Sequence, residues 1–413
     1  MRPSIFTPTH TARYLDNCYG SLTGQTISDW EWIVLLNGAA PDWRPPIDDP
    51  RVRVLRSGET AGVGAVKAQA CDAATGDVLV ELDHDDVLLP DCLAAVVDAF
   101  EAHPGAALVY SDFAQINDDL SPNDERFGDV YGWVYSSETH AGRVYTRCHA
   151  MVPHPHNVGY IWYAPNHVRA FSTAAYRQAG GYDRTLTVLD DQELMMRLYL
   201  VGDFVHIDRL LYLQRMHPGN TQRDPELNPF IQEQTVRYYR EHCEALFSAW
   251  CRRNGLRILG LRTATSPELE TIEGEEVLTL DAETPVIDAD VDSVGLVRAI
   301  ELLQRIPDRA ALFNECYRVC VHGSMLRTLT PSTDGRGAFQ DPSHVAFYNE
   351  NSFWYLTQAA RRASIPALDA RLQVGYIGTV YPSEFYRDAQ IPMVEADLLA
   401  IKDGPRLGGP LLC

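Results

Sequence analysis

The sequence lacks an excess of basic residues, a paired cysteine motif and any long apolar run. Its 413 residues include 35 lysines and arginines against 56 aspartates and glutamates, which gives a formal net charge of −21. This balance argues against a general nucleic-acid or anionic-membrane binder, although one bound metal ion can locally reverse the field for a nucleotide. No apolar run approaches about 18 residues, so we expect no transmembrane helix.

The nine cysteines are scattered along the chain, and none forms a CxxC pair. An odd, unpatterned number of cysteines is typical of reduced thiols, and residues 1–8 contain no apolar stretch suited to a signal peptide. We therefore expect a cytoplasmic protein. The length predicts two domains of ordinary size. A helix stop after a long amphipathic stretch at residues 229–254 predicts the domains 1–255 and 256–413.

The most informative stretch is acidic and covers residues 81–90. An apolar run, Val78–Val80, predicts a buried strand, and the carboxylates of Asp83, Asp85 and Asp86 follow where this strand ends. Open α/β sheets bind ligands at the carboxyl ends of their strands, and hard oxygen ligands suit Mg²⁺ or Mn²⁺. The run therefore predicts a metal site. The alternative is an acidic loop that only caps the helix beginning near Pro90.

Strands and helices alternate along the first half of the chain, which predicts an α/β fold with a parallel sheet. The apolar and alternating runs predict strands at residues 4–7, 30–36, 51–55, 77–80, 107–116 and 211–216. Helical spacing predicts helices at residues 14–22, 62–74 and 91–100.

The order of these motifs resembles a family 2 glycosyltransferase of the GT-A fold, over about residues 1–250. The resemblance depends on residues 4–9, 30–34, 62–67 and 82–86 taken together, because several weak motifs in the right order are stronger than any one. It implies a Rossmann-like domain that binds a nucleotide sugar, most commonly a UDP-sugar, together with Mn²⁺ or Mg²⁺.

The resemblance also implies residues that bind the nucleotide sugar. Thr7, Pro8 and Thr9 match the end of the first strand, which lies against the base in this family. Asn37 stands where the family usually has an aspartate that reads uracil. An amide both donates and accepts hydrogen bonds, so Asn37 still suits a pyrimidine edge, but the departure leaves another base open. Lys67 takes the place of a common arginine, and its alternative is a solvated helix lysine.

The acidic run matches the DxD motif of the family. Asp83 then belongs beside the ribose and with the metal, and His84 belongs to the nucleotide-sugar site. Asp85 is expected to bind the metal on the diphosphate, and Asp86 to support the same site or cap the next helix. His217 is expected to reach back towards the metal, although a lone histidine in a turn is often structural.

A second group of residues resembles the catalytic motif of the family. Residues 180–183 read Gly-Gly-Tyr-Asp, and Asp190 and Asp191 follow before an apolar helix that contains Arg197. The resemblance implies that Asp191 is the catalytic base. An aspartate before a helix can also cap it, so we expect Asp190 to cap and Asp191 to face the cleft. Between the motifs, residues 118–165 are rich in aromatic side chains that are expected to shape the acceptor side, or to pack as a lid. The aromatic residues in question are Tyr131, Trp133, Tyr135, Tyr160, Trp162 and Tyr163.

The second half of the chain resembles the latter part of class I methyltransferase-like proteins, best at residues 297–357. It lacks the glycine-rich turn that such a fold needs, because the candidate turn at residues 260–263 has one glycine. The segment between Asp281 and Leu296 is also too short for a complete βαβ unit of about 30 residues. We expect a shortened Rossmann-like domain without S-adenosylmethionine, in which residues 296–306 and 310–320 are helical. The large apolar side chains of this half, Phe339, Phe347, Phe353, Trp354 and Tyr355, are expected to be buried.

The resemblance, taken with these patterns, implies an inverting, metal-dependent glycosyltransferase that transfers a hexose, most commonly glucose, from a UDP-sugar to a small-molecule or saccharide hydroxyl. Secondary-metabolite biosynthesis fits such an acceptor, and a homodimer is compatible with the second domain. Two alternatives stay open: an enzyme of surface-polysaccharide assembly, and an inactive nucleotide-binding scaffold.

Overall fold

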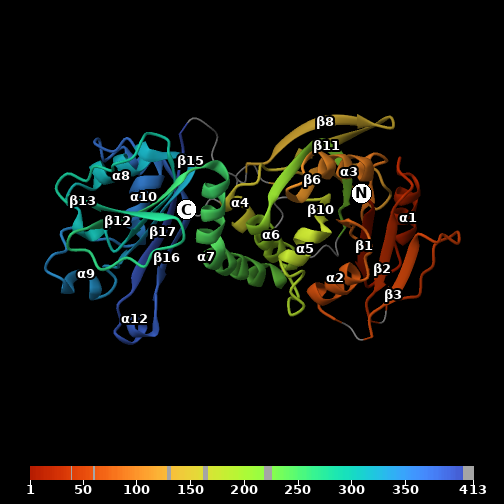
Figure 1. The fold of residues 1–413 in the computed structure, drawn as a ribbon, viewed down its shortest axis with the longest axis horizontal. Helices are drawn as coiled ribbons and strands as arrows, with labels where there is room; N and C mark the ends of the chain where they lie inside the picture. The colour runs from red at the N-terminus through yellow and green to blue at the C-terminus, as the bar shows by residue number, and fades with distance from the viewer. Residues whose placement is uncertain (39, 59–60, 128–131, 161–165, 218–225, 403–413) are drawn as a thin grey trace. The chain divides into compact units, whose positions relative to one another are not determined.

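The computed structural model describes residues 1–38, 40–58, 61–127, 132–160, 166–217 and 226–402. The chain divides into two compact units, Met1–Cys243 and Glu244–Cys413 (Figure 1). The division falls inside the helix α7 (Leu227–Asn254), whose end was the predicted domain boundary. None of the helices among the described residues combines the length and apolar character that a bilayer-spanning helix needs.

The first unit is built on one mixed sheet in which the strand order is β3-β2-β1-β4-β10-β6-β11-β5. The first four strands of the chain pair in parallel, as do β6 and β11, whereas β10 runs antiparallel to both β4 and β6. The strands on this path are β1 (Pro3–Thr9), β2 (Glu31–Leu36), β3 (Val52–Arg56), β4 (Val78–Glu81), β5 (Val87–Leu88), β6 (Ala106–Ile116), β10 (Arg169–Ser172) and β11 (Asp203–Arg215).

The predicted α/β class is confirmed, but the expectation of a parallel sheet is wrong at β5, which runs antiparallel to β11, and at β10. This strand begins at Arg169, opposite Glu81 at the carboxyl end of β4, and therefore runs back towards the amino end of β4. A hairpin precedes it, formed by β8 (Val134–His140) and β9 (Arg143–His149). The sequence analysis predicts no strand at these four residues, and a local pattern would in any case carry no information on which strands β10 inserts between.

Helices cover both faces of this sheet because its buried strands carry apolar side chains on alternate sides. Ile5 and Val80 belong to a core shared with the first and third helices, and Phe6 and Leu79 to a core shared with the second, fifth and sixth. The helices of this unit are α1 (Leu15–Thr23), α2 (Val63–Asp72), α3 (Cys92–Ala102), α4 (Pro155–Tyr160), α5 (Thr173–Gln178) and α6 (Asp190–Val201).

The second unit has a six-stranded sheet in the order β13-β12-β14-β15-β17-β16. Its first four strands pair in parallel, and β17 runs antiparallel to both of its neighbours. Its elements are β12 (Arg257–Thr263), β13 (Glu275–Leu280), β14 (Val294–Ile300), η3 (Leu303–Arg305), α8 (Arg309–Val319), β15 (Cys320–Pro331), α9 (Gly337–Gln340), α10 (Glu350–Thr357), α11 (Ala359–Arg362), β16 (Leu372–Val380), α12 (Glu384–Asp388) and β17 (Met393–Ala400).

Three expectations for this unit need correction. Residues 296–306 are not helical, because they form most of β14 and a short 3₁₀ turn; a continuous apolar run buried in a sheet resembles a buried helix in sequence. Residues 260–263 are not a turn, since they lie inside β12. Phe353 is fully buried, but Phe339 and Phe347 are 63% and 45% exposed and stack on each other, so burial is wrong for these rings. Tyr355 is exposed as well.

The parallel strands β12, β13 and β14 follow one another without an intervening helix. Residues 264–274 and 281–293, which the structure describes, contain turns and irregular segments only. The predicted incomplete βαβ unit is therefore what the chain forms between β13 and β14. The likeness to methyltransferases as such stays a prediction.

Candidate functional site

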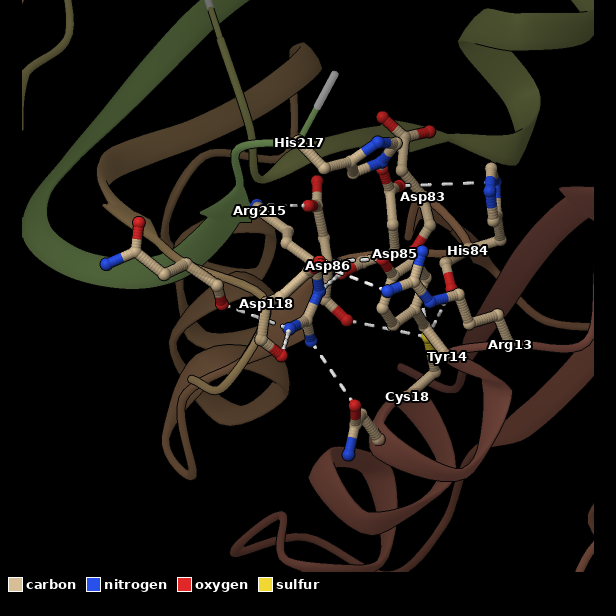
Figure 2. Close-up of polar contacts among 12 residues, drawn as sticks. Arg13, Tyr14, Cys18, Asp83, His84, Asp85, Asp86, Asp118, Arg215 and His217 are labelled. Carbon is tan, nitrogen blue, oxygen red and sulfur yellow. Dashed lines mark hydrogen bonds and ion pairs between the residues drawn. The ribbon is translucent and has the colours of Figure 1, made fainter. Parts of the chain in front are cut away.

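The acidic loop at residues 82–86 emerges from the carboxyl end of β4 and is held by β11. The Tyr212 hydroxyl accepts a hydrogen bond from the backbone N–H of Asp83 (3.2 Å) and donates one to Oδ2 of Asp86 (2.7 Å). The backbone N–H of Arg215 donates to Oδ1 of Asp86 (2.7 Å), and its Nε donates to the carbonyl of Asp85 (2.6 Å). Figure 2 shows the Arg215 side chain passing beside the acidic loop. The loop therefore has a fixed shape.

Helix α1 and the residue before it support the same loop from another side (Figure 2). The buried thiol of Cys18 lies 3.3 Å from the carbonyl oxygen of His84 and 3.4 Å from that of Asp86. The Tyr14 ring lies 4.5 Å from the Arg215 guanidinium, and its hydroxyl donates to Asp118 (2.7 Å). Burial raises the pKa of the Cys18 thiol well above its usual value, and Asp86 raises it further. Cys18 is consequently a structural thiol.

Asp85 and His217 form the pair that best fits a divalent cation. Nε2 of His217 lies 2.8 Å from Oδ2 of Asp85, and the Asp85 side chain is 12% exposed. Both oxygens of Asp86 accept hydrogen bonds, and burial, with Asp85 and Asp83 close by, raises its pKa well above the usual range. Asp86 therefore supports the loop. A cation held by Asp85 and His217 would take its remaining ligands from waters and substrate phosphates, as Mg²⁺ commonly does.

A second set of possible metal ligands lies near the β8–β9 hairpin. Ligand atoms of Asp112, His149 and Asp208 lie within 4.8 Å of one another. However, Arg147 donates from Nε to Oδ2 of Asp112 (2.7 Å) and also contacts Asp208, while His206 lies 2.6 Å from Oδ1 of Asp112. A cation would have to displace this arginine. The Asp85–His217 pair is the better fit.

Lys67 is buried and ion-paired rather than solvated. Its Nζ lies 2.6 Å from Glu81 and 2.8 Å from Asp190. Burial alone lowers the pKa of Lys67, but Asp190 and Glu81 raise it well above its usual value. Asp190 does not cap α6, because the N-cap is Leu189, at a φ of 59°, and Asp190 is the first helical residue. Burial raises the pKa of Asp190 to about 6, against the opposing effect of Lys67.

Arg169 connects this buried group to the expected base. Its Nε lies 2.9 Å from Glu81, and its Nη1 donates to Oδ2 of Asp191 (2.8 Å). The other oxygen of Asp191 accepts from the backbone N–H of Gln192 (2.8 Å). Burial raises the pKa of Asp191, but Arg169 and then Lys67 outweigh it, so the net shift is downward and the carboxylate is ionised.

His167 lies between Arg169 and the acidic loop. Its Nε2 is 3.0 Å from Nη2 of Arg169 and 3.2 Å from Oδ2 of Asp83. Because arginine only donates, the first contact uses the lone pair of Nε2 and the second uses a proton on it, so His167 serves one partner at a time. Burial raises the pKa of Asp83, yet His167, Lys67 and Arg169 lower it more strongly.

Sequence reasoning missed His167 and Arg169. Arg169 is the first residue of β10, a strand of only four residues, and His167 lies in the irregular segment before it, so no alternating pattern of strand length marks the two. Contacts between distant segments bring them to Glu81 and Asp83.

The residues expected to lie against the nucleotide base make hydrogen bonds within the protein. The Thr7 hydroxyl donates to the carbonyl of Leu82 (2.8 Å), which ties β1 to the acidic loop. Thr9 accepts from the N–H of Thr11 (3.1 Å), and Pro8 is partly buried between them. Both amide atoms of Asn37 contact the backbone of Ala61, at 3.0 and 3.1 Å. A base edge read by Asn37 would replace these two hydrogen bonds, and its role stays a prediction.

His84 and the aromatic stretch complete the set of predicted residues. The His84 ring is partly buried and meets His10 edge-on at 5.0 Å. Trp133 is buried against Phe113 and Phe127 and is a core residue rather than a platform for a sugar. Tyr131, Trp162 and Tyr163 lie outside the described residues.

Comparison with known proteins agrees with this geometry. Residues 4–162 match the model of the family described as "Glycosyl transferase family 2". The family resemblance predicted for the first half is confirmed over this segment.

The chain is also similar to parts of longer curated proteins. It is 26% identical over 225 residues to a chondroitin synthase of Escherichia coli, which covers 53% of this chain and 29% of that protein. It is 25% identical over 224 residues to a hyaluronan synthase of Pasteurella multocida, covering 53% of this chain and 21% of that protein. The chain thus spans less than a third of the length of either relative. Among solved structures, S. aureus TarS in complex with UDP-GlcNAc is 15% identical, with a TM-score of 0.44, over 62% of this chain and 73% of that one.

Proposed function

We propose, from the family 2 glycosyl transferase segment at residues 4–162 as premise, that the protein transfers a hexose from a UDP-sugar to a hydroxyl of a saccharide acceptor with inversion. The observation that carries the proposal is that two carboxylates, Asp85 and Asp191, each have a different basic partner. Asp85 is paired with His217, which suits a cation, and Asp191 is held by Arg169, which suits a base.

The chain's residues divide the work on the donor. Asp85 and His217 would hold a Mn²⁺ or Mg²⁺ ion, with Asp83 on the ribose side of the same loop. The bound ion would offset negative charge on the departing diphosphate, a Lewis-acid role. Beneath this site, Lys67 and Glu81 form a buried ion pair of 2.6 Å, which helps to fix the end of β4 from which the acidic loop emerges.

Asp191 would act on the acceptor. Its carboxylate takes the proton of the attacking hydroxyl as that oxygen bonds to the anomeric carbon and the UDP leaves from the opposite face. One displacement inverts the configuration, so an α-linked donor gives a β-glycoside. An ionised Asp191 is ready to accept a proton, and each carboxylate oxygen keeps a lone pair beyond those used by Arg169 and Gln192.

The relatives favour a saccharide over another small molecule as acceptor, because two of them are named for the synthesis of polysaccharides. This supports the surface-polysaccharide reading more than the secondary-metabolite reading. For the sugar itself, glucose is the first choice to test, and N-acetylated hexoses are the second.

The deciding experiment is a donor screen with the purified protein. UDP release is measured from UDP-glucose, UDP-galactose, UDP-GlcNAc and UDP-glucuronate, with and without oligosaccharide acceptors, in Mn²⁺, in Mg²⁺ and after chelation. We expect turnover of at least one donor, dependent on metal. Calorimetric titration of UDP separates the scaffold alternative: absence of both turnover and metal-linked UDP affinity would show that the proposal is wrong.

A further inference from the structure

The base of the proposed reaction is positioned by a residue from a different part of the chain. Asp191 lies in the first turn of α6, and one of its oxygens is fixed by the N–H of Gln192. The other oxygen accepts from Nη1 of Arg169 at 2.8 Å. Among the described residues, no other hydrogen bond fixes the direction of Oδ2.

Arg169 is itself anchored to the sheet. It is 3% exposed, and it is the first residue of β10, where it pairs in register with Glu81 of β4. Its Nε lies 2.9 Å from the Glu81 carboxylate. The acidic loop leaves β4 directly after Glu81. One guanidinium is therefore tied both to the strand that carries the metal-side loop and to the helix that carries the base.

The contacts need the shape of arginine and not only its charge. Nη1 of the guanidinium donates to Asp191, Nε lies 2.9 Å from the Glu81 carboxylate as an ion pair, and Nη2 lies 3.0 Å from Nε2 of His167, a contact made when that nitrogen carries no proton. Arginine offers a planar fork of nitrogens, whereas a lysine ammonium is a single point charge. We infer that Arg169 is a positioning residue that fixes the Asp191 carboxylate relative to the acidic loop. This inference rests on the proposed function for the role of Asp191.

The first test compares Arg169→Lys with a matched variant of the second unit, Arg298→Lys. Arg298 is also buried, at 8% exposure, and contacts two carboxylates, Glu275 (2.6 Å) and Glu244. Both variants keep the charge and lose the fork, so both should lower the thermal midpoint. A catalytic group that moves by about 1 Å can cost about 10² in rate, so we expect kcat to fall at least about tenfold in Arg169→Lys only. The donor KM should stay within about twofold.

The outcomes are separable. Equal kcat in Arg169→Lys, Arg298→Lys and the unmodified protein would overturn the inference. A fall in kcat of the same size in both variants would assign the loss to general destabilisation and would overturn it as well. A fall confined to Arg169→Lys supports it.

The second test does not depend on turnover. The pKa of Asp191 is measured by titrating ¹³C-labelled aspartate carboxyls in two proteins, Glu81→Gln and the double variant Arg169→Met/Glu81→Gln. Both carry Glu81→Gln, so that removing Arg169 does not leave a buried, charged Glu81 without its partner. The groups facing Asp191 in both proteins are Lys67, Asp190 and the Gln192 N–H. We expect a higher pKa of Asp191 in the double variant, because only there is the guanidinium missing.

Equal Asp191 titration in these two proteins would overturn the inference. If the unmodified protein transfers no sugar from any donor, the proposed function fails, and the titration still decides the contact between Arg169 and Asp191.

Discussion

Each unit of the protein buries an arginine between carboxylates, and the two sites differ in what lies beyond those carboxylates. Arg298 in β14 contacts the fully buried side chain of Glu275 and the 30% exposed side chain of Glu244. Arg169 in β10 likewise contacts one fully buried side chain, that of Glu81, and one that is 17% exposed, that of Asp191. The local electrostatics are alike, since each cation offsets the cost of burying its acidic partners. The difference lies in the third contact: Nη1 of Arg298 donates to the backbone carbonyl of Glu270, whereas Nη2 of Arg169 contacts His167, which lies 3.2 Å from Asp83 of the acidic loop.

Replacing the carboxylate that Arg169 contacts, Asp191, should have the largest effect on kcat. Asp191→Asn keeps the shape of the side chain but cannot take a proton, and loss of a general base typically costs about 10² to 10⁴ in rate. Calorimetry should show nearly unchanged binding of the UDP-sugar. If Asp190→Asn proves the inactive variant instead, the roles of the two aspartates are reversed.

The equivalent change in the second unit should affect stability and leave turnover unchanged. Glu275→Gln leaves Arg298 with less compensating charge, and breaking a buried pair costs about 3 to 5 kcal/mol. Denaturant unfolding should report this loss, while kcat per folded molecule stays the same. A large fall in kcat with intact folding would mean that the second unit takes part in the chemistry, and the contrast between the two arginines would not hold.

A pH series tests whether burial outweighs the Lys67 pair at Asp190. Burial raises the pKa of Asp190 from 3.8 to about 6, so its native state binds a proton more tightly than the unfolded chain does. Stability from this proton is present below the lower value and is lost as the pH rises through about 6. Between these values the unfolding free energy of the unmodified protein should fall by about 1 to 3 kcal/mol relative to Asp190→Asn. A rise instead would show that the pairing with Lys67 dominates.

Substitution of the proposed metal ligand Asp85 should give the smallest of these effects on turnover. Asp85→Asn keeps the side-chain size and the neighbourhood of His217 but removes a charge from the cation site. We expect metal-dependent turnover to fall by about tenfold, or 1.4 kcal/mol, and the metal concentration for half-maximal activity to rise. Full activity at low Mn²⁺ would place the cation elsewhere, and the Asp112 group would then be examined by the same substitution.

The sequence alone was sufficient to predict that β4 ends at a group of carboxylates, because a buried apolar run followed by acidic residues is a contiguous pattern. It was also sufficient for the order of most helices and strands in the first unit. It could not predict that Arg215 supports the acidic loop or that Arg169 contacts Asp191, because these contacts join segments far apart in the chain. Leu189 illustrates the same limit, since its left-handed φ of 59° displaces the expected cap at Asp190 and no local residue preference predicts it.

The insertion of β10 between β4 and β6 also has a consequence for how the chain is made. The two strands that flank β10 end at Glu81 and Ile116, long before Arg169 is synthesised, so each has an unpaired edge on the nascent chain. Such edges can pair with strands of other chains. Pairing between strands distant in sequence is slow, because the entropy of closing the intervening loop is lost before the stabilising contacts form. The closing strand begins with Arg169 itself. Pairing of β10 into the sheet and placement of the guanidinium against Glu81 and Asp191 are thus one folding event, so a chain in which β10 has not yet paired lacks both contacts.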